Sequence, residues 1–152
     1  MEAGTSQALV IEREVHVDAS RDTVFEFFTD PAKMVRWMGV AATIDPRPGG
    51  AYRIDIHSYI AVGEFTEVDH PSRIVMTWGW ESHPELAAPG SSIVTVDLTE
   101  HGGGTLVRLT HTGLAGPAIT GHSDGWDKYM PRLAIAAAGG DPGPDPDPTK
   151  ED

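Results

Sequence analysis

The chain has 152 residues and a mass of 16.3 kDa, a size that predicts one domain. Eleven Lys and Arg stand against 23 Asp and Glu, and the net charge of −12 disfavours nucleic acid or anionic lipid as a partner. The chain has no cysteine, which excludes disulfides, thiolate nucleophiles and cysteine-based metal sites. No apolar run approaches the roughly 20 residues that cross a bilayer, and the start of the chain does not resemble a secretory signal. We therefore expect a cytoplasmic protein without a membrane partner.

The N-terminal part of the chain predicts one strand and two short helices. Residues 1–8 are expected to form a flexible N-terminus, and residues 9–17 have the period of two of a half-buried strand, although Arg13 disturbs its inner face. Ser20 can cap the helix that follows, because apolar residues then recur at helical spacing. Asp30-Pro31 should end this helix and start the second one.

The period of two returns near residue 40 and predicts six further strands. Their connectors are mostly short and carry Gly, Pro and Asp, so consecutive strands should pair antiparallel. Segment 81–90 is longer and has no strong period, and it could form a mobile flap at one end of the sheet. The predicted strands are 40–45, 51–58, 61–68, 74–80, 92–99 and 105–112.

A long helix is expected at the C-terminal end of the domain. Trp126, Tyr129, Leu133 and Ala137 recur at intervals of three and four residues, which favours a helix laid against the sheet. Pro131 should kink or split this helix, unless the helix starts only near Pro131. The domain should therefore cover residues 9–138, and the Asp- and Pro-rich segment 139–152 is expected to be a disordered acidic tail.

These elements predict an α+β fold in which a seven-stranded antiparallel sheet curls around the C-terminal helix to bury its inner face. The helix loses bulk toward its end, at Ala134, Ala136, Ala137 and Ala138, so we expect a gap between the sheet and this end. Such a gap is either filled by bulky strand side chains or kept for a ligand.

Twelve residues are candidates for the lining of this space. Strand alternation points three sets of side chains inward, and residues of the helices close the ends. Tyr52, Tyr129 and His111 have polar tips that require partners in an apolar surround. The same residues could equally be ordinary core. The candidates are Trp37, Tyr52, Ile54, Ile56, Met76, Trp78, Trp80, Leu109, His111, Trp126, Tyr129 and Leu133.

His111 is the strongest candidate for chemistry, because it ends an apolar strand face where a half-buried imidazole could orient a ligand or act as a base. The alternative is a core histidine that is hydrogen-bonded to the backbone. The histidines show no i, i+4 pair and no HExxH motif, and Ser58, Ser91 and Ser92 lack the elbow motif of serine hydrolases. We therefore assign no catalytic residue, no metal and no cofactor.

Five segments resemble, in this order, the successive motifs of one family. They are DASRDTVFEFFTDPAKMVRW, RPGGAYR, GEFTEVDHPSRIVMTWGW, GGGTLVRLTHTGL and GHSDGWDKYMPRL. From Leu9 to about Ala138 the chain is similar to the AHSA-type proteins, which are homologues of the activator of the heat-shock-protein ATPase in the START-like (SRPBCC) superfamily.

The resemblance implies a helix-grip fold around a hydrophobic cavity, and no family-wide catalytic residue. It gives a lining role to Trp37, Tyr52, Trp78, His111 and Trp126. Pro131 departs from the expected helix and leaves the shape of the cavity's far end open.

The favoured hypothesis is non-catalytic: the protein binds, carries or sequesters a small hydrophobic molecule, aromatic or polycyclic, between sheet and helix. A cyclase- or hydrolase-like enzyme would use the same cavity, with His111 or Tyr129 as proton carrier. A co-chaperone ranks third, because the similar eukaryotic activators carry a further N-terminal domain that is not expected here. Monomer and homodimer both stay open. The absence of Asn and the excess of Arg over Lys are typical of a GC-rich bacterium.

Overall fold

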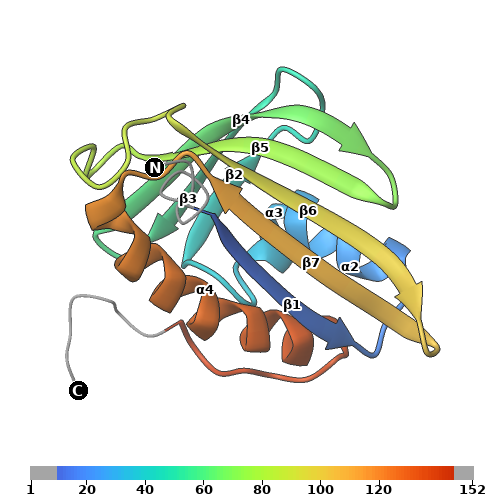
Figure 1. Cartoon of the computed structure of the whole chain (residues 1–152). Coiled ribbons are helices and arrows are strands. Elements are labelled where there is room, and N and C mark those ends of the chain that lie inside the picture. Colours follow the sequence, from blue (N-terminus) through green and yellow to red (C-terminus); the bar gives the residue numbers. More distant parts are fainter. Residues whose placement is uncertain (1–9, 146–152) are drawn as a thin grey trace, which may run out of the picture.

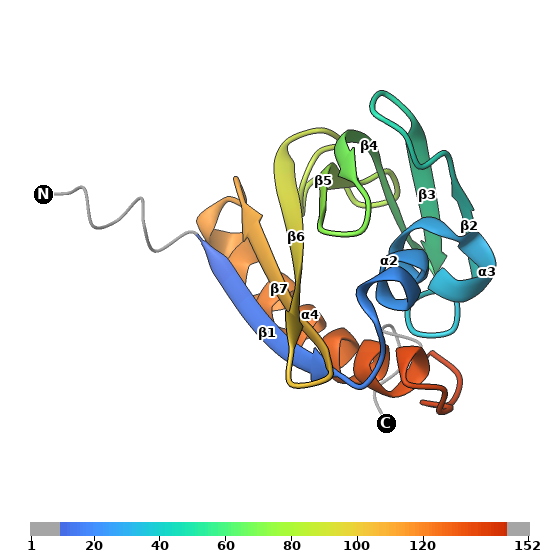
Figure 2. The same ribbon diagram turned by 90° about the vertical axis from the view of Figure 1, so that its right-hand side faces the viewer.

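The computed structural model describes residues 10–145, and the structural statements below refer to these residues. Seven strands form one antiparallel sheet in the order β1-β7-β6-β5-β4-β3-β2 (Figure 1). Figure 2 shows the sheet bent into a trough, with α4 along the concave side and α3 beside β2. The predicted α+β helix-grip fold is confirmed. The elements are β1 (Ile11–Val17), α2 (Arg21–Thr29), α3 (Pro31–Met34), β2 (Ala41–Ile44), β3 (Ala51–Ile56), β4 (Tyr59–Asp69), β5 (Arg73–Trp80), β6 (Ser92–His101), β7 (Gly104–Thr112) and α4 (Gly116–Ala137).

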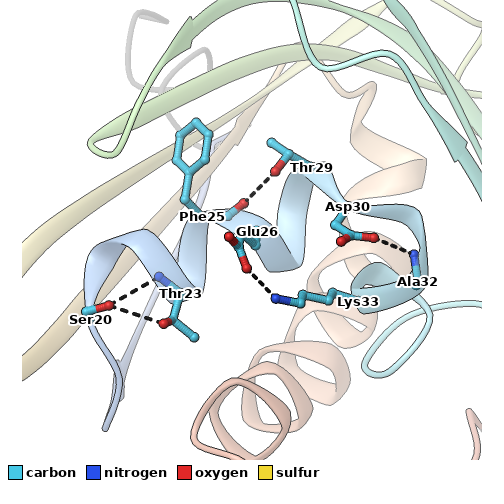
Figure 3. Close-up of polar contacts among 8 residues, drawn as sticks. All are labelled: Ser20, Thr23, Phe25, Glu26, Thr29, Asp30, Ala32 and Lys33. Carbon is cyan, nitrogen blue, oxygen red and sulfur yellow. Dashed lines mark hydrogen bonds and ion pairs between the residues drawn. The ribbon is translucent and has the colours of Figure 1, made fainter.

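Two side-chain caps build the short helical segment between β1 and β2 (Figure 3). The Ser20 hydroxyl accepts a hydrogen bond from the Thr23 backbone N–H at 3.2 Å, which satisfies a free donor at the start of α2. The Asp30 carboxylate accepts from the Ala32 backbone N–H at 2.9 Å and caps α3 in the same way. The predicted pair of helices therefore forms where the capping residues place it.

The hairpin between β3 and β4 turns earlier than the predicted strands 51–58 and 61–68 imply. Ile56 pairs with Tyr59, so His57 and Ser58 alone make the turn. His57 has a φ of 60°, in the left-handed region that such tight turns require. Its Nε2 lies 2.9 Å from the backbone oxygen of Asp145, so the C-terminal segment supports the turn.

Helix α4 is longer than expected and continuous. It begins at Gly116 and passes through Pro131 to Ala137, so the predicted split and the alternative start near Pro131 are both wrong. Pro131 is exposed, while its neighbours Met130 and Leu133 are buried against the sheet. The missing backbone donor therefore falls on the solvent side, and packing of the opposite face holds the helix together.

Arg13 does not disturb the inner face of β1 as the sequence suggested. Its Nε donates to Asp127 Oδ1 on α4 at 2.6 Å, and its Nη2 donates to the Ser123 hydroxyl. The side chain therefore ties the edge strand to the outer face of the helix.

Residues 139–145, which we call the C-terminal strap, contact the domain, although the sequence assigned them to a disordered tail. Arg132 Nη2 donates to the Gly143 oxygen at 2.8 Å, and its Nε donates to the Trp37 oxygen at 2.9 Å. The buried Asp145 carboxylate accepts from the Tyr129 hydroxyl at 2.8 Å and from the Gly39 backbone N–H. The strap is thus held by polar side chains, whereas the sequence was judged by its lack of apolar residues that a core could bury. The expected flexible N-terminus and the rest of the tail lie outside the described residues.

We predict that Asp145→Ala lowers the free energy of unfolding by about 1–3 kcal/mol, because it leaves the Tyr129 hydroxyl and the Gly39 N–H without their acceptor. Urea denaturation measures the change. Asp18→Ala removes the same charge from a carboxylate that is 88% exposed and serves as the control, with an expected change within about 0.5 kcal/mol. Equal effects of the two substitutions would show that the strap does not stabilise the domain.

Candidate functional site

A cavity of about 500 Å³ lies between the concave face of the sheet and the N-terminal part of α4. This volume falls within the range of small-molecule sites. The sheet contributes large aromatic and aliphatic side chains, and α4 contributes both small residues and larger side chains. The lining residues are Met38, Ile56, Tyr59, Trp78, Trp80, Leu86, Pro117, Ala118, Gly121, His122, Asp124, Gly125, Trp126, Lys128 and Tyr129.

Small residues of α4 leave the space open. Ala118, Gly121 and Gly125 are spaced so that they share one side of the helix, and a Cβ atom added at either glycine would meet nothing within 4 Å. The expected gap at the alanine-rich end of the helix does not exist, because Ala136 and Ala137 are buried in the packed core. Short side chains there let the helix approach the sheet closely. The prediction placed the gap at the wrong end of the helix.

The loop after β5 contributes Leu86 to the lining of the cavity. The Trp80 backbone N–H donates to the Ala87 oxygen at 2.8 Å, and the Ser82 hydroxyl accepts from the Ile60 backbone N–H at 2.8 Å. A Cβ atom at Gly79 would lie 2.3 Å from the Ala88 oxygen, so only glycine permits this close approach. The segment predicted as a flap is therefore anchored to the sheet and places Leu86 at the cavity.

His111 lies behind the cavity wall, fully buried, with both ring nitrogens in hydrogen bonds. The Trp126 indole N–H donates to His111 Nδ1 at 3.0 Å, so the neutral ring carries its proton on Nε2. This Nε2–H donates to the Ser92 hydroxyl at 2.9 Å, and that hydroxyl donates to the Trp78 oxygen at 2.7 Å. Each donor in this series of hydrogen bonds, from Trp126 through His111 and Ser92, has an acceptor. His111 is therefore a core histidine whose hydrogen bonds are all made.

His122 forms a second bond between an indole and an imidazole, at the cavity itself. The Trp80 indole N–H donates to His122 Nε2 at 2.8 Å, and His122 Nδ1–H donates to the Ala118 oxygen at 2.8 Å. The His111 and His122 rings lie edge to face, with centroids 5.3 Å apart. Helix and sheet are thus joined by one hydrogen bond in each direction.

Both imidazoles are held in their neutral form. The pKa of His111 is lowered from 6.5 to about 3, mainly by burial and in smaller part by repulsion from the charge of a protonated His122. Burial also lowers the pKa of His122, although its bond to the Ala118 oxygen opposes the shift. The pKa of Tyr129 is raised, first by burial and then by the Asp145 carboxylate. The His122 imidazole and the Tyr129 hydroxyl, which both lie at the cavity, are therefore uncharged near neutral pH.

The structure brings five of the twelve candidate residues to the cavity: Ile56, Trp78, Trp80, Trp126 and Tyr129. The other seven are buried in the packed core and do not line the cavity; they are Trp37, Tyr52, Ile54, Met76, Leu109, His111 and Leu133. Alternation shows which face of a strand a side chain is on, but not how closely other elements pack against that face. It therefore cannot separate residues that line the cavity from residues that are buried in the core.

Several lining residues were missed by the sequence analysis, above all Met38, Tyr59, His122 and the two helix glycines. The repeat of Ala118, Gly121 and Gly125 in the sequence is the signal that could have located the open part of the helix. Among residues 10–145, no group of three or more His, Asp or Glu side chains converges on one point, and no helix is long and apolar enough to cross a membrane.

We predict that stability falls at acid pH because His111 is buried neutral. The unfolded chain binds a proton there near pH 6.5, and the native chain only near its pKa of about 3. The stabilisation is fully present above pH 6.5 and is lost as the pH falls toward 3, at about 1.4 kcal/mol per pH unit for one proton.

His111→Gln checks the assignment, because glutamine keeps one donor and one acceptor but does not titrate. Urea denaturation between about pH 6 and about pH 4 should give a shallower pH dependence for this variant by close to one proton. Identical slopes for the variant and the wild type would contradict the assignment.

Comparison with known proteins places this geometry in one family. The family described as "Activator of Hsp90 ATPase homolog 1-like protein" matches residues 18–138. The solution structure of an AHSA1-like protein of Rhizobium etli is 43% identical, with 94% of this chain and 89% of that chain covered and a TM-score of 0.70.

Two more distant proteins match only part of their length. The crystal structure of DynU16, a protein of the dynemicin biosynthetic locus, has a TM-score of 0.75 at 23% identity and covers 88% of this chain but 49% of DynU16. An uncharacterized protein of Schizosaccharomyces pombe is 33% identical over 67 residues, which are 44% of this chain and 19% of that protein. The chain therefore spans less than two thirds of either protein. From the fold and the family match together, the chain belongs to the Activator of Hsp90 ATPase homolog 1-like family.

Proposed function

We propose that this protein binds a small, neutral aromatic molecule in the cavity between the sheet and α4, and carries or sequesters it without chemical change. The observation that supports this most directly is the cavity of about 500 Å³ with indole and phenol walls. The Trp78 ring centroid lies 5.5 Å from that of Trp80 and 5.4 Å from that of Trp126. Flat ligands gain dispersion and edge-to-face contacts from such walls.

The polar groups at the cavity favour a binding role over a catalytic one. Both ring nitrogens of His122 are engaged with Trp80 and Ala118, and the Tyr129 hydroxyl donates to Asp145. A general acid or base needs a free site within reach of the substrate proton. His111 lies outside the cavity lining, so neither proton carrier of the enzymatic hypothesis is free to act.

Segment 121–125, Gly-His-Ser-Asp-Gly, also matches the G-x-S-x-G pattern of serine hydrolases. The pattern requires a sharp turn between strand and helix that exposes the serine. Here Ser123 lies inside α4, and its hydroxyl accepts from Arg13. The match therefore does not supply a nucleophile.

We predict that neutral two- and three-ring aromatic compounds quench tryptophan fluorescence and raise the melting temperature. A ligand at a hundred times its Kd stabilises the native state by about 2.7 kcal/mol. Gly121→Leu and Gly125→Leu should abolish both effects, because their side chains occupy the open space. Loss of a helix glycine should leave the free protein as stable as before or more stable, by up to about 1 kcal/mol.

The matched control is Gly116→Leu, at a helix glycine that does not line the cavity. This variant should keep the wild-type response to the compounds. A panel that leaves the wild type unchanged, or responses that survive both cavity substitutions, would contradict the proposed site.

A further inference from the structure

Asp145 of the C-terminal strap lies where three segments of the domain meet. Its carboxylate accepts from the Tyr129 hydroxyl on α4, which lies 2.8 Å and 3.0 Å from its two oxygens, and from the Gly39 backbone N–H between α3 and β2. Its backbone oxygen accepts from His57 Nε2 in the β3–β4 turn at 2.9 Å. One residue of the strap thus contacts three segments that are far apart in the sequence.

Each of these three segments also supplies a side chain to the cavity. Tyr129 lines the cavity itself, Met38 comes directly before Gly39, and Ile56 comes directly before the β3–β4 turn. Asp145 is buried but is not among the lining residues, so it contacts the walls of the cavity and not its contents. Tyr129 is the last residue of α4 in the lining, which places these contacts at one end of the cavity.

The backbone of the strap is held independently of the Asp145 side chain. After α4 the chain turns back and runs beside this helix (Figure 1). Arg132 of α4 donates from Nη2 to the Gly143 oxygen at 2.8 Å and from Nη1 to the Pro142 oxygen at 3.1 Å. A substitution at position 145 leaves these main-chain acceptors in place. Replacing Asp145 should therefore remove its carboxylate contacts and leave the strap beside the helix.

We infer that Asp145 is a positioning residue of the binding site: its carboxylate joins Tyr129 to the Met38–Gly39 backbone, so that a molecule in the cavity meets a preformed end wall. This inference rests on the proposed binding function and adds a residue of the strap to it. A wall that is ordered before binding spares the complex the entropy cost of ordering it. The coupling is reciprocal, so a bound molecule stabilises the contacts of Asp145 by the same factor by which these contacts strengthen its binding.

The first test measures the Kd of 2-methoxynaphthalene, a neutral two-ring probe, by calorimetry for wild type, Asp145→Ala and Tyr129→Phe. Both substitutions remove the same hydrogen bond, the first from outside the cavity and the second with the aromatic ring retained. Each should weaken binding about tenfold, the scale of one net hydrogen bond. The double variant should bind about as weakly as the weaker single variant, because both residues act through one contact.

Val17→Ala separates the positioning of the wall from a general loss of stability. Val17 is fully buried in the core and does not line the cavity. Its truncation destabilises the fold by leaving a void in the core, but it should keep the Kd within about twofold of the wild type.

Hydrogen exchange gives the reciprocal readout in the wild type and needs no variant. The Gly39 N–H exchanges only when its contact with Asp145 opens, so saturating 2-methoxynaphthalene should slow this exchange about tenfold. The Ser72 N–H donates to the Asp69 oxygen at 2.8 Å in the turn between β4 and β5, outside the cavity lining. Its exchange rate should stay unchanged.

Wild-type affinity in Asp145→Ala, or equal losses of affinity in Asp145→Ala and Val17→Ala, would overturn the positioning role while the proposed binding function stands. A double variant whose loss is the sum of the two single losses would do the same, and so would Gly39 exchange that the bound probe leaves unchanged. If the probe does not bind the wild type, both the inference and the proposed function are contradicted.

Discussion

Two hydrogen bonds between indole and imidazole rings fix the distance between the helix and the sheet. Trp126 on α4 donates to His111 on β7, and Trp80 on β5 donates to His122 on α4. The bonds run in opposite directions, so each layer supplies one donor and one acceptor. Both require neutral imidazoles, which burial enforces. The cavity lies beside these bonds, and its width depends on them.

The order of elements could be predicted from the sequence because each signal is local. Period-two alternation located all seven strands, and the capping residues Ser20 and Asp30 located the two short helices. The five motifs in their order pointed to the same fold and family, and the family match covers residues 18–138. Local signals also explain the misplaced turn at His57, since no glycine marks the left-handed position there.

The site was predicted only in part because it depends on how elements approach one another. Alternation brought Trp78 and Trp80 to the inner face but could not show that Ile54 and Leu109 lie in the packed core, away from the cavity. The alanines at the end of α4 suggested a gap, but Ala136 and Ala137 are buried in the packed core. The strap was missed for a related reason: Asp145 and Arg132 anchor it through polar groups whose partners are distant in sequence.

The division of labour along α4 has a consequence for divergence among related proteins. Leu133, Ala136 and Ala137 hold the helix in the core, whereas Gly121 and Gly125 border empty space. Substitutions at the two glycine positions can change the shape of the cavity without touching the packed half of the helix. Under the proposed binding function, selection on ligand choice and selection on folding act on separate residues of the same helix.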